Sequence, residues 1–375
     1  MNFTALTKTL DKFVELGVPA NDCIVYYKGK EVYRYQNGYL GKERYNIYSC
    51  SKPITCAAAL QLYEKGMFKL EDKLSDYMPE FKNMTVKEED GTIRPAKTEI
   101  TIKDLFCMTA GFSYWLRTPH LMRCREETDG KCPTRLTMEY LAKEPLLFDP
   151  GERWQYSLCH DVLAALVEVL SGMPFEEYVK KNIFEPLNMN HSDFLPDYST
   201  LANEITPLCK WNAEINGAEV LPSKVPAYRL GTEYASGGAG CVSTVEDYIK
   251  FTEAMRVGDV ILKKETIDLM QTNQLTDKQL ESCWVKGYGY GLGVRCPIEG
   301  SAVSDFGWGG AAGAYLAIDR ENEFSFFYAQ HLLSTPVEIN RNGLTRVVYE
   351  CIYDIDSEQK ELPKGNENTE GAAFV

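Results

Sequence analysis

The 375-residue sequence lacks any run of eighteen apolar residues and any excess of basic residues. The missing apolar run argues against a membrane-spanning helix. The formal net charge of −14 disfavours nucleic acids and anionic membrane surfaces as partners. Hydrophobic residues make up 44% and charged residues 25%, as in ordinary globular proteins. A chain of this size and composition can bury a core without disulfide staples.

Motifs for metal binding and for disulfide frameworks are also missing. The chain has 12 cysteines but no Cys-x-x-Cys pair, and its 4 histidines show no ligand spacing with one another or with cysteines. We therefore predict no zinc site and no cofactor. Several cysteines stand in apolar helical patterns, so we expect free thiols in a reducing compartment. Cys124 and Cys132, which flank a short polar loop, remain the one pair for which a disulfide stays open.

The first residues lack the uninterrupted apolar stretch of a signal peptide. Lys8, Asp11 and Lys12 alternate with apolar residues, which is the pattern of an amphipathic helix. We therefore expect a cytoplasmic protein. The alternative is that a leader has been removed from a longer precursor.

Strand-like segments lie near both ends of the chain, and helical segments lie between them. The pattern predicts strands at 22–27, 31–35, 288–295, 302–306, 313–318 and 324–330, and helices at 4–17, 51–65, 102–109, 137–143, 159–170, 175–184, 244–255, 264–270 and 340–353. Residues 112–135 read as a long loop. This order indicates an α+β fold with one antiparallel sheet built from both chain ends. We expect a single domain over 1–355, with an α/β lobe at about 1–48 and 230–355, a helical lobe at about 49–229, and a flexible acidic tail at 356–375.

Ser49 and Lys52 form the most informative motif of the chain. Residues three apart share one face of a helix, so a lysine can activate a serine nucleophile at this spacing. A serine in the first helical turn also gains from the helix dipole. The S-x-x-K spacing alone is weak, since Ser357 and Lys360 match it in the acidic tail. The alternative to a catalytic pair is a structural role, in which Ser49 is an N-cap and Lys52 is a solvated charge.

Three further stretches could complete a serine active site. Tyr156 follows a Pro-Gly turn and precedes an apolar helix, so its phenol could act as a general base beside Lys52, or simply pack in the core. In the stretch 306–311, the amide of Ala311 could join that of Ser49 in an oxyanion hole, or the glycines could only form a bend. Residues 237–244 predict a closely packed crossing beside the site, and no phosphate-binding lysine follows them. The sequence contains no G-x-S-x-G elbow of α/β-hydrolases.

Taken together, these motifs resemble the serine β-lactamase-related superfamily. The resemblance rests on Tyr48-Ser-Cys-Ser-Lys-Pro, Leu105-Phe-Cys-Met-Thr-Ala-Gly-Phe, Pro150-Gly-Glu-Arg-Trp-Gln-Tyr-Ser, Gly237-Gly-Ala-Gly and Gly307-Trp-Gly-Gly, and it covers roughly residues 20–350. It implies a β-lactamase and penicillin-binding-protein transpeptidase-like fold. It also implies Ser49 as nucleophile, Lys52 and Tyr156 as acid–base partners, and Ser49 and Ala311 as oxyanion donors.

Two departures from the penicillin-acting members concern the substrate. Leu158 stands where those members carry an asparagine that grips a substrate amide, and Trp308 stands where they carry a Lys or His. A pocket that loses these polar partners favours neutral, apolar esters. Trp308, Gly309 and Gly310 would then contact substrate, together with Leu158. Tyr114 and Trp115 could form an aromatic wall over the pocket, or they could pack in the core, as could Phe112.

The sequence therefore predicts a serine hydrolase of carboxylic esters, acting as an esterase or acyltransferase through an acyl-Ser49 intermediate. The expected partner is a small-molecule ester or acyl substrate, and the oligomeric state stays open. A β-lactamase or D-alanyl-D-alanine carboxypeptidase is the alternative within enzymes. A catalytically silent binding or sensor module on the same fold is the alternative of another class.

Overall fold

The computed structural model describes residues 1–38, 43–201, 203–285, 287–301 and 304–354, and the predicted tail lies outside them. Its helices are α1 Thr4–Glu15, η1 Tyr48–Cys50, α2 Ser51–Glu64, η2 Leu74–Asp76, η3 Pro79–Phe81, α3 Ile102–Cys107, α4 Pro119–Glu127, α5 Thr134–Leu141, α6 Cys159–Ser171, α7 Phe175–Val179, η4 Lys180–Phe184, α8 Val245–Val257, α9 Lys264–Met270, α10 Asp277–Ser282, η5 Arg341–Gly343 and α11 Leu344–Tyr353. Its strands are β1 Asn21–Tyr27, β2 Lys30–Asn37, β3 Tyr45–Asn46, β4 Thr85–Lys87, β5 Ile93–Pro95, β6 Cys209–Asn212, β7 Gly217–Val220, β8 Val242–Ser243, β9 Gly289–Tyr290, β10 Arg295–Cys296, β11 Phe306–Gly309, β12 Tyr315–Asp319, β13 Phe324–Gln330 and β14 Leu332–Leu333.

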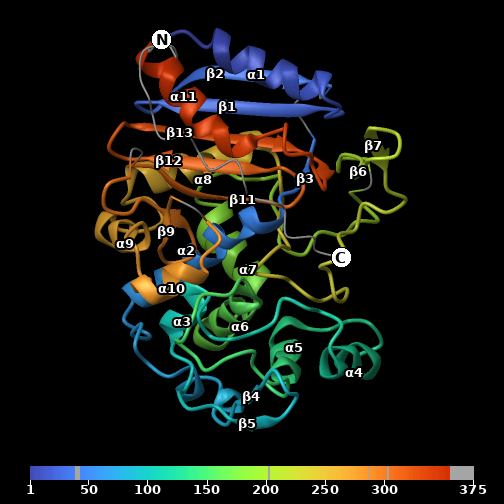
Figure 1. Cartoon of the computed structure of the whole chain (residues 1–375), viewed down its shortest axis with the longest axis vertical. Coiled ribbons are helices and arrows are strands. Elements are labelled where there is room, and N and C mark those ends of the chain that lie inside the picture. Colours follow the sequence, from blue (N-terminus) through green and yellow to red (C-terminus); the bar gives the residue numbers. More distant parts are fainter. Residues whose placement is uncertain (39–42, 202, 286, 302–303, 355–375) are drawn as a thin grey trace.

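The main sheet joins the two ends of the chain. Its seven strands run in the order β2-β1-β13-β12-β11-β10-β9, and neighbours pair antiparallel. In Figure 1 the blue β1 lies directly beside the red-orange β13. The prediction of an antiparallel sheet built from both ends is confirmed, and the predicted strands at 22–27 and 324–330 correspond to β1 and β13.

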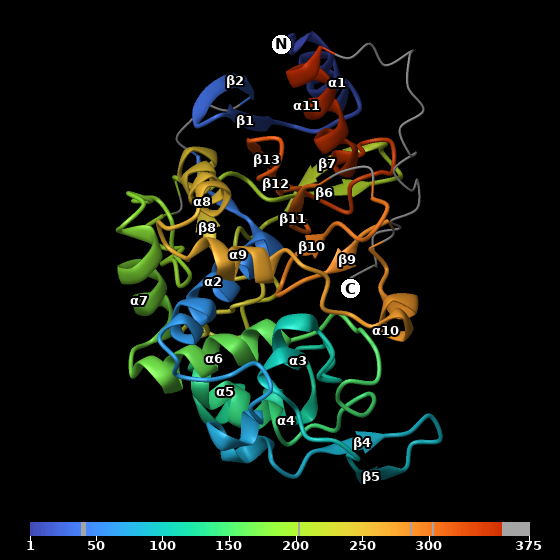
Figure 2. The same cartoon turned by 90° about the vertical axis from the view of Figure 1, so that its left-hand side faces the viewer.

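Both faces of this sheet are covered because its central strands are apolar on both sides. Along β13, Phe326 and Tyr328 pack in the cluster with α1 and α11, whereas Phe327 and Ala329 pack in the cluster that contains α2 and α8. This period of two follows from the alternation of side chains along a strand. Figure 2 shows α1 and α11 on one side of the sheet, and α2, α8 and α9 on the other.

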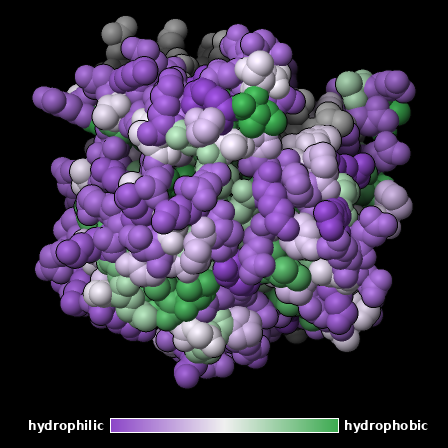
Figure 3. Space-filling model, turned by 90° about the horizontal axis from the view of Figure 1, so that it is seen from below, coloured by the Kyte–Doolittle hydropathy of each residue, from purple (hydrophilic) through white to green (hydrophobic). Residues whose placement is uncertain are grey.

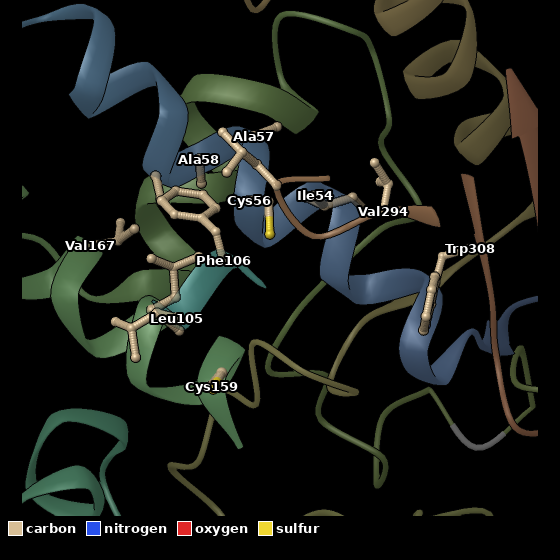
Figure 4. Packing of buried hydrophobic residues seen from close by; sticks show 14 of the residues in the cluster. Ile54, Cys56, Ala57, Ala58, Leu105, Phe106, Cys159, Val167, Val294 and Trp308 are labelled. Carbon is tan, nitrogen blue, oxygen red and sulfur yellow. The ribbon is translucent and has the colours of Figure 1, made fainter. Parts of the chain in front are cut away.

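Helix α2 lies between the sheet and the helical region and is buried on nearly every side. Eleven of its residues, from Ser51 to Leu62, are buried. A helix that is apolar all round belongs in the interior. Figure 4 shows α2 with Ile54, Cys56 and Ala57 close to Phe106 of α3 and to helix α6. The serine and lysine of the S-x-x-K motif therefore stand just before and just inside the start of an enclosed helix.

Two sequence predictions of elements were wrong, and one small sheet was missed. Residues 112–135 contain α4 and the start of α5, because Pro119 opens a helix whose Leu121 and Cys124 reach the core. The predicted strand 288–295 is a hairpin of β9 and β10, since Gly293 takes a φ of +88° and turns the chain. The small sheet of β14, β6 and β7 was not predicted at all.

The surface view in Figure 3 shows a mostly hydrophilic face with separate apolar patches. Within the described ranges, no helix is long and apolar enough to cross a membrane. All twelve cysteines, including Cys124 and Cys132, are buried free thiols.

Replacing Phe327 by alanine tests the packing of the sheet on α8. Its ring is fully buried and stacks on Tyr248 with the centroids 4.1 Å apart. We expect Phe327→Ala to lower the free energy of unfolding by about 3–5 kcal/mol, measured by urea denaturation. The matched control Val337→Ala, at a side chain 65% exposed, should change it by less than about 0.5 kcal/mol. A loss below about 1 kcal/mol for Phe327→Ala would contradict this packing.

Candidate active site

Ser49 lies in the short helix η1, which leads directly into α2. Its side chain is 9% exposed, so the hydroxyl sits just below the surface. The preceding Tyr48 has a φ of +48°, in the left-handed region that bulky residues rarely adopt. Such backbone strain is typical of functional sites and has to be offset by surrounding packing. Here Tyr48 is buried, with its ring edge-on to Tyr228.

Lys52 is fully buried, and its amine is surrounded by three oxygen atoms. Nζ lies 3.2 Å from Ser49 Oγ, 3.4 Å from the Tyr114 hydroxyl and 2.7 Å from the carbonyl of Gly238. Burial lowers the pKa of Lys52 from 10.5 to about 7, and the charge of Asp161 opposes this shift. The alternative prediction, that Lys52 is a solvated lysine in the first turn of the helix, is wrong because the side chain is fully buried.

Tyr156 precedes α6 and meets Ser49 from the opposite side. Its hydroxyl lies 2.6 Å from Ser49 Oγ, and the Trp308 Nε1–H donates to that hydroxyl over 3.3 Å. The ring stacks on Trp308 and lies under Lys52 Nζ, 4.4 Å from the ring centroid. Burial raises the pKa of Tyr156 well above 10, so the phenol keeps its proton at neutral pH.

The end of β11 approaches the backbone in front of Ser49. A Cβ atom on Gly310 would lie 2.2 Å from the carbonyl oxygen of Ile47, so only glycine fits there. The Gly310 amide donates to Ala314 O over 2.7 Å, which closes the turn after the strand. Ala311 lies partly buried in the small cluster that contains Tyr48. These contacts place the backbone of the predicted second oxyanion donor beside the nucleophile's turn.

The other predicted substrate residues separate into two groups. Tyr114 belongs to the site, because its ring stacks on Tyr156 with a centroid distance of 5.1 Å. Trp308 and Leu158 are buried, 3% exposed each. Trp115 is 51% exposed, and its backbone N–H donates to Ser113 Oγ. Phe112 packs in the core against Phe81, as predicted by the alternative in which it has no role in the pocket.

Sequence reasoning missed several residues that shape the site. Trp284 is 43% exposed, and its ring contacts Tyr156 and Trp308 with centroids 5.8 and 5.7 Å away. It lies in an irregular segment after α10, where no sequence period marks it. Asp161 and the segment 234–238 were missed as well. The predicted close crossing at 237–244 is real, since a Cβ on Gly237 would lie 2.3 Å from His160 O.

The arrangement brings together a serine hydroxyl, an amine of low basicity and a phenol, all shielded from bulk water. Such a set can activate a nucleophile and return a proton to a leaving group. Among the described residues, no group of three His, Cys, Asp or Glu side chains could hold a metal ion. The site is thus built from organic acid–base groups and aromatic rings.

Comparison with known proteins defines the class to which this fold and site belong. The Beta-lactamase family model matches residues 6–349, so the chain belongs to the beta-lactamase family. The predicted family and its transpeptidase-like fold are confirmed, and the chain is an enzyme of the serine hydrolase class.

Several relatives of the chain carry esterase or acyltransferase names. The chain is 27% identical to esterase EstB of Burkholderia gladioli, over 88% of this chain and 89% of EstB. It is 28% identical to acyltransferase calJ of Penicillium decumbens, over 76% of this chain and 74% of calJ. The solved structure of simvastatin synthase (LovD) from Aspergillus terreus has a TM-score of 0.76 at 20% identity, covering 94% of this chain and 98% of LovD.

Gly310 offers a test of the approach between β11 and η1. In Gly310→Ala the new methyl group would collide with Ile47 O and push the strand end away from Ser49. We expect kcat for ester hydrolysis to fall by about 100-fold with a smaller change in KM, because oxyanion donors act on the transition state. The control Gly217→Ala, whose Cβ would meet its nearest atom at 3.8 Å, should keep wild-type kcat. Unchanged kcat in a folded Gly310→Ala protein would refute this role.

Proposed function

We propose that this enzyme hydrolyses or transfers the acyl group of neutral carboxylic esters through an acyl-Ser49 intermediate. The observation that carries the proposal is the contact of Ser49 Oγ with Lys52 Nζ on one side and the Tyr156 hydroxyl on the other. The names of EstB and calJ support ester and acyl substrates. Leu158 and Trp308 support an apolar ester over a peptide or a β-lactam, because Leu158 has no polar group and Trp308 carries no charge to engage a substrate carboxylate.

In the first step Ser49 Oγ attacks the ester carbonyl and its proton passes to Lys52. With a pKa of about 7, a sizeable fraction of Lys52 is free amine at neutral pH. That amine can accept from Ser49 while it donates to Gly238 O and to the Tyr114 hydroxyl. Tyr156 is a poor base because burial raises its pKa. Of the two candidates left open by the sequence, Lys52 is therefore the better general base.

The tetrahedral oxyanion would rest on the amides of Ser49 and Ala311. Both amides belong to backbone that packing holds in place before substrate binds. Such preorganised donors are the condition for strong electrostatic stabilisation of an oxyanion. Tyr156, hydrogen-bonded to Ser49 Oγ and to Trp308, then carries a proton from the Lys52 ammonium to the departing alcohol. The phenol gives one proton and receives another, so it ends the step unchanged.

The acyl group leaves Ser49 by the reverse sequence. Lys52 takes a proton from water, which completes hydrolysis, or from an alcohol, which completes acyl transfer. The aromatic rings of Tyr114, Trp284 and Trp308 around the nucleophile offer apolar surface that favours an organic acceptor over water.

Ser49→Ala tests the nucleophile. We expect turnover of p-nitrophenyl esters from acetate to octanoate to fall at least about 10⁴-fold without loss of thermal stability. Ser171→Ala, at the far end of α6, is the control and should keep wild-type rates. A fluorophosphonate probe should label the wild type and not Ser49→Ala. Substantial turnover by Ser49→Ala would refute the acyl-enzyme scheme, and an unlabelled, inactive wild type would favour the silent module.

The same panel separates the enzyme alternatives. Nitrocefin and a D-Ala-D-Ala peptide should react far more slowly than the esters, since Leu158 cannot hydrogen-bond their amide and Trp308 offers no charge to their carboxylate. Added alcohols should yield new esters if acyl transfer competes with water. Rapid nitrocefin hydrolysis would instead establish a β-lactamase pocket.

The pH dependence of kcat/KM tests Lys52 as base. Because the free amine is the active form, kcat/KM should fall as the pH drops through the Lys52 pKa of about 7. If the acid limb of kcat/KM persists in the double variant His120→Gln/His191→Gln, these two histidines do not cause it. His160 does not titrate in this range, because burial lowers its pKa to about 3. A flat profile between about pH 8 and pH 6, or a limb abolished by the histidine changes, would contradict this assignment.

A further inference from the structure

Asp161 is a buried carboxylate that no step of the proposed reaction uses. It lies in the first turn of α6, five residues after Tyr156, and is 1% exposed. A carboxylate buried to this extent costs several kcal/mol unless it is paired or hydrogen-bonded, by the general penalty for buried charges. Its partners therefore indicate what it stabilises.

The partners of Asp161 all come from one short segment. The Tyr234 hydroxyl donates to Oδ1 over 2.7 Å and the Ser236 hydroxyl over 2.6 Å. The backbone N–H of Gly238 also bonds to the carboxylate. Segment 234–238 has no regular secondary structure. Asp161 is thus the acceptor for three donors of this segment, which is also held by Thr55, donating to Gly237 O over 2.7 Å, and by Thr134, accepting from the Ala235 N–H over 2.8 Å.

This segment is the one that holds Lys52. Gly238 O accepts from Lys52 Nζ at 2.7 Å, a shorter contact than the 3.2 Å to Ser49 Oγ. A Cβ on Gly238 would lie 2.7 Å from Asp161 Oδ2 and 3.4 Å from Lys52 Nζ. The carboxylate and the amine therefore face the same side of one glycine, which leaves no room for a side chain between them.

The charge of Asp161 acts on the same amine. Burial raises the pKa of this carboxyl, and the Ser236 and Tyr234 hydroxyls, the charge of Lys52 and the Gly238 N–H oppose that rise. Among the charges around Lys52, Asp161 raises its pKa most, ahead of the thiols of Cys56, Cys50 and Cys159. The phenols of Tyr114 and Tyr156 keep their protons because burial raises their pKa values, and buried His160 stays neutral. Asp161 thus limits how far burial can weaken the lysine as a base.

We propose that Asp161 is a positioning residue for Lys52, an inference that rests on the proposed function. Through Tyr234, Ser236 and the Gly238 N–H it fixes the peptide whose carbonyl aims Lys52 Nζ at Ser49 Oγ. Its negative charge keeps the aimed amine basic enough to take the serine proton. It touches neither substrate nor the reacting atoms.

Asp161→Asn is the direct test, with Asp247→Asn as the matched control. Asp247 is likewise a buried carboxylate in the first turn of a helix, and it holds the backbone N–H of His191 at 2.6 Å. We expect Asp161→Asn to lower kcat for ester hydrolysis by about 10- to 100-fold with little change in KM. Asp247→Asn should leave kcat near the wild-type value, even if the protein loses stability.

The pH profile separates positioning from a structural role. Removing the negative charge lowers the Lys52 pKa, so the acid limb of kcat/KM should move to lower pH by about one unit in Asp161→Asn. Asp161→Glu, which keeps the charge, should keep the limb near its wild-type position. Wild-type kcat in Asp161→Asn would overturn the proposal, and so would a reduced kcat with an unmoved acid limb.

Two further variants test the positioning role of Asp161 if Asp161→Asn does not fold. Tyr234→Phe and Ser236→Ala each remove one donor and leave the carboxylate in place. Each should lower kcat by about tenfold with KM nearly constant, and wild-type kcat in both would overturn the proposal. Ser49→Ala, measured in parallel, distinguishes a failure of the proposed function from a failure of this inference. Activity in Ser49→Ala would refute the proposed function. An inactive Ser49→Ala protein together with Asp161 variants of wild-type activity would refute this inference alone.

Discussion

The chemistry proposed for this protein depends on the burial of one amine, that of Lys52. Lys52 is fully enclosed, and loss of hydration is the largest cause of its lowered pKa. An exposed lysine at the same spacing from Ser49 would stay protonated near neutrality and could not accept a proton. The architecture serves this burial, because α2 carries Lys52 between a sheet built from both chain ends and the helices α3 and α6 (Figures 1 and 4).

Segments far apart in the sequence meet at the start of α2, and glycine makes each meeting possible. Gly238 admits the amine and Asp161, while Gly310 brings β11 against Ile47 O. Aromatic rings fill the remaining volume around Tyr156, which contacts Tyr114, Trp154, Trp284 and Trp308. The phenol is thereby held in one orientation, as the proposed relay of protons requires.

Sequence motifs predicted the parts of the site that are encoded locally. Ser49 and Lys52 share one helical turn, and Tyr156 and Trp308 stand in recognisable short motifs, so each could be named before the fold was known. The long-range sheet of β1 and β13 also followed, because strand-like segments stood only near the chain ends. Asp161 could not be found in this way. It is one acidic residue in an apolar helix, and its role depends on Tyr234 and Ser236 more than seventy residues away.

The same physical reasoning bears on the choice between hydrolysis and acyl transfer. Ser49 is 9% exposed, and the rings of Tyr114 and Trp284 lie against Tyr156 beside it, so an acceptor that reaches the acyl carbon meets aromatic side chains. Water gains little from apolar walls, whereas an alcohol with an apolar body buries surface there and is held next to Lys52. The amine itself does not distinguish the two, because it removes a proton from either hydroxyl. In the proposed mechanism, the ratio of transfer to hydrolysis is therefore set by these aromatic rings and by acceptor concentration, while Lys52 and the groups that hold it set the rate of both.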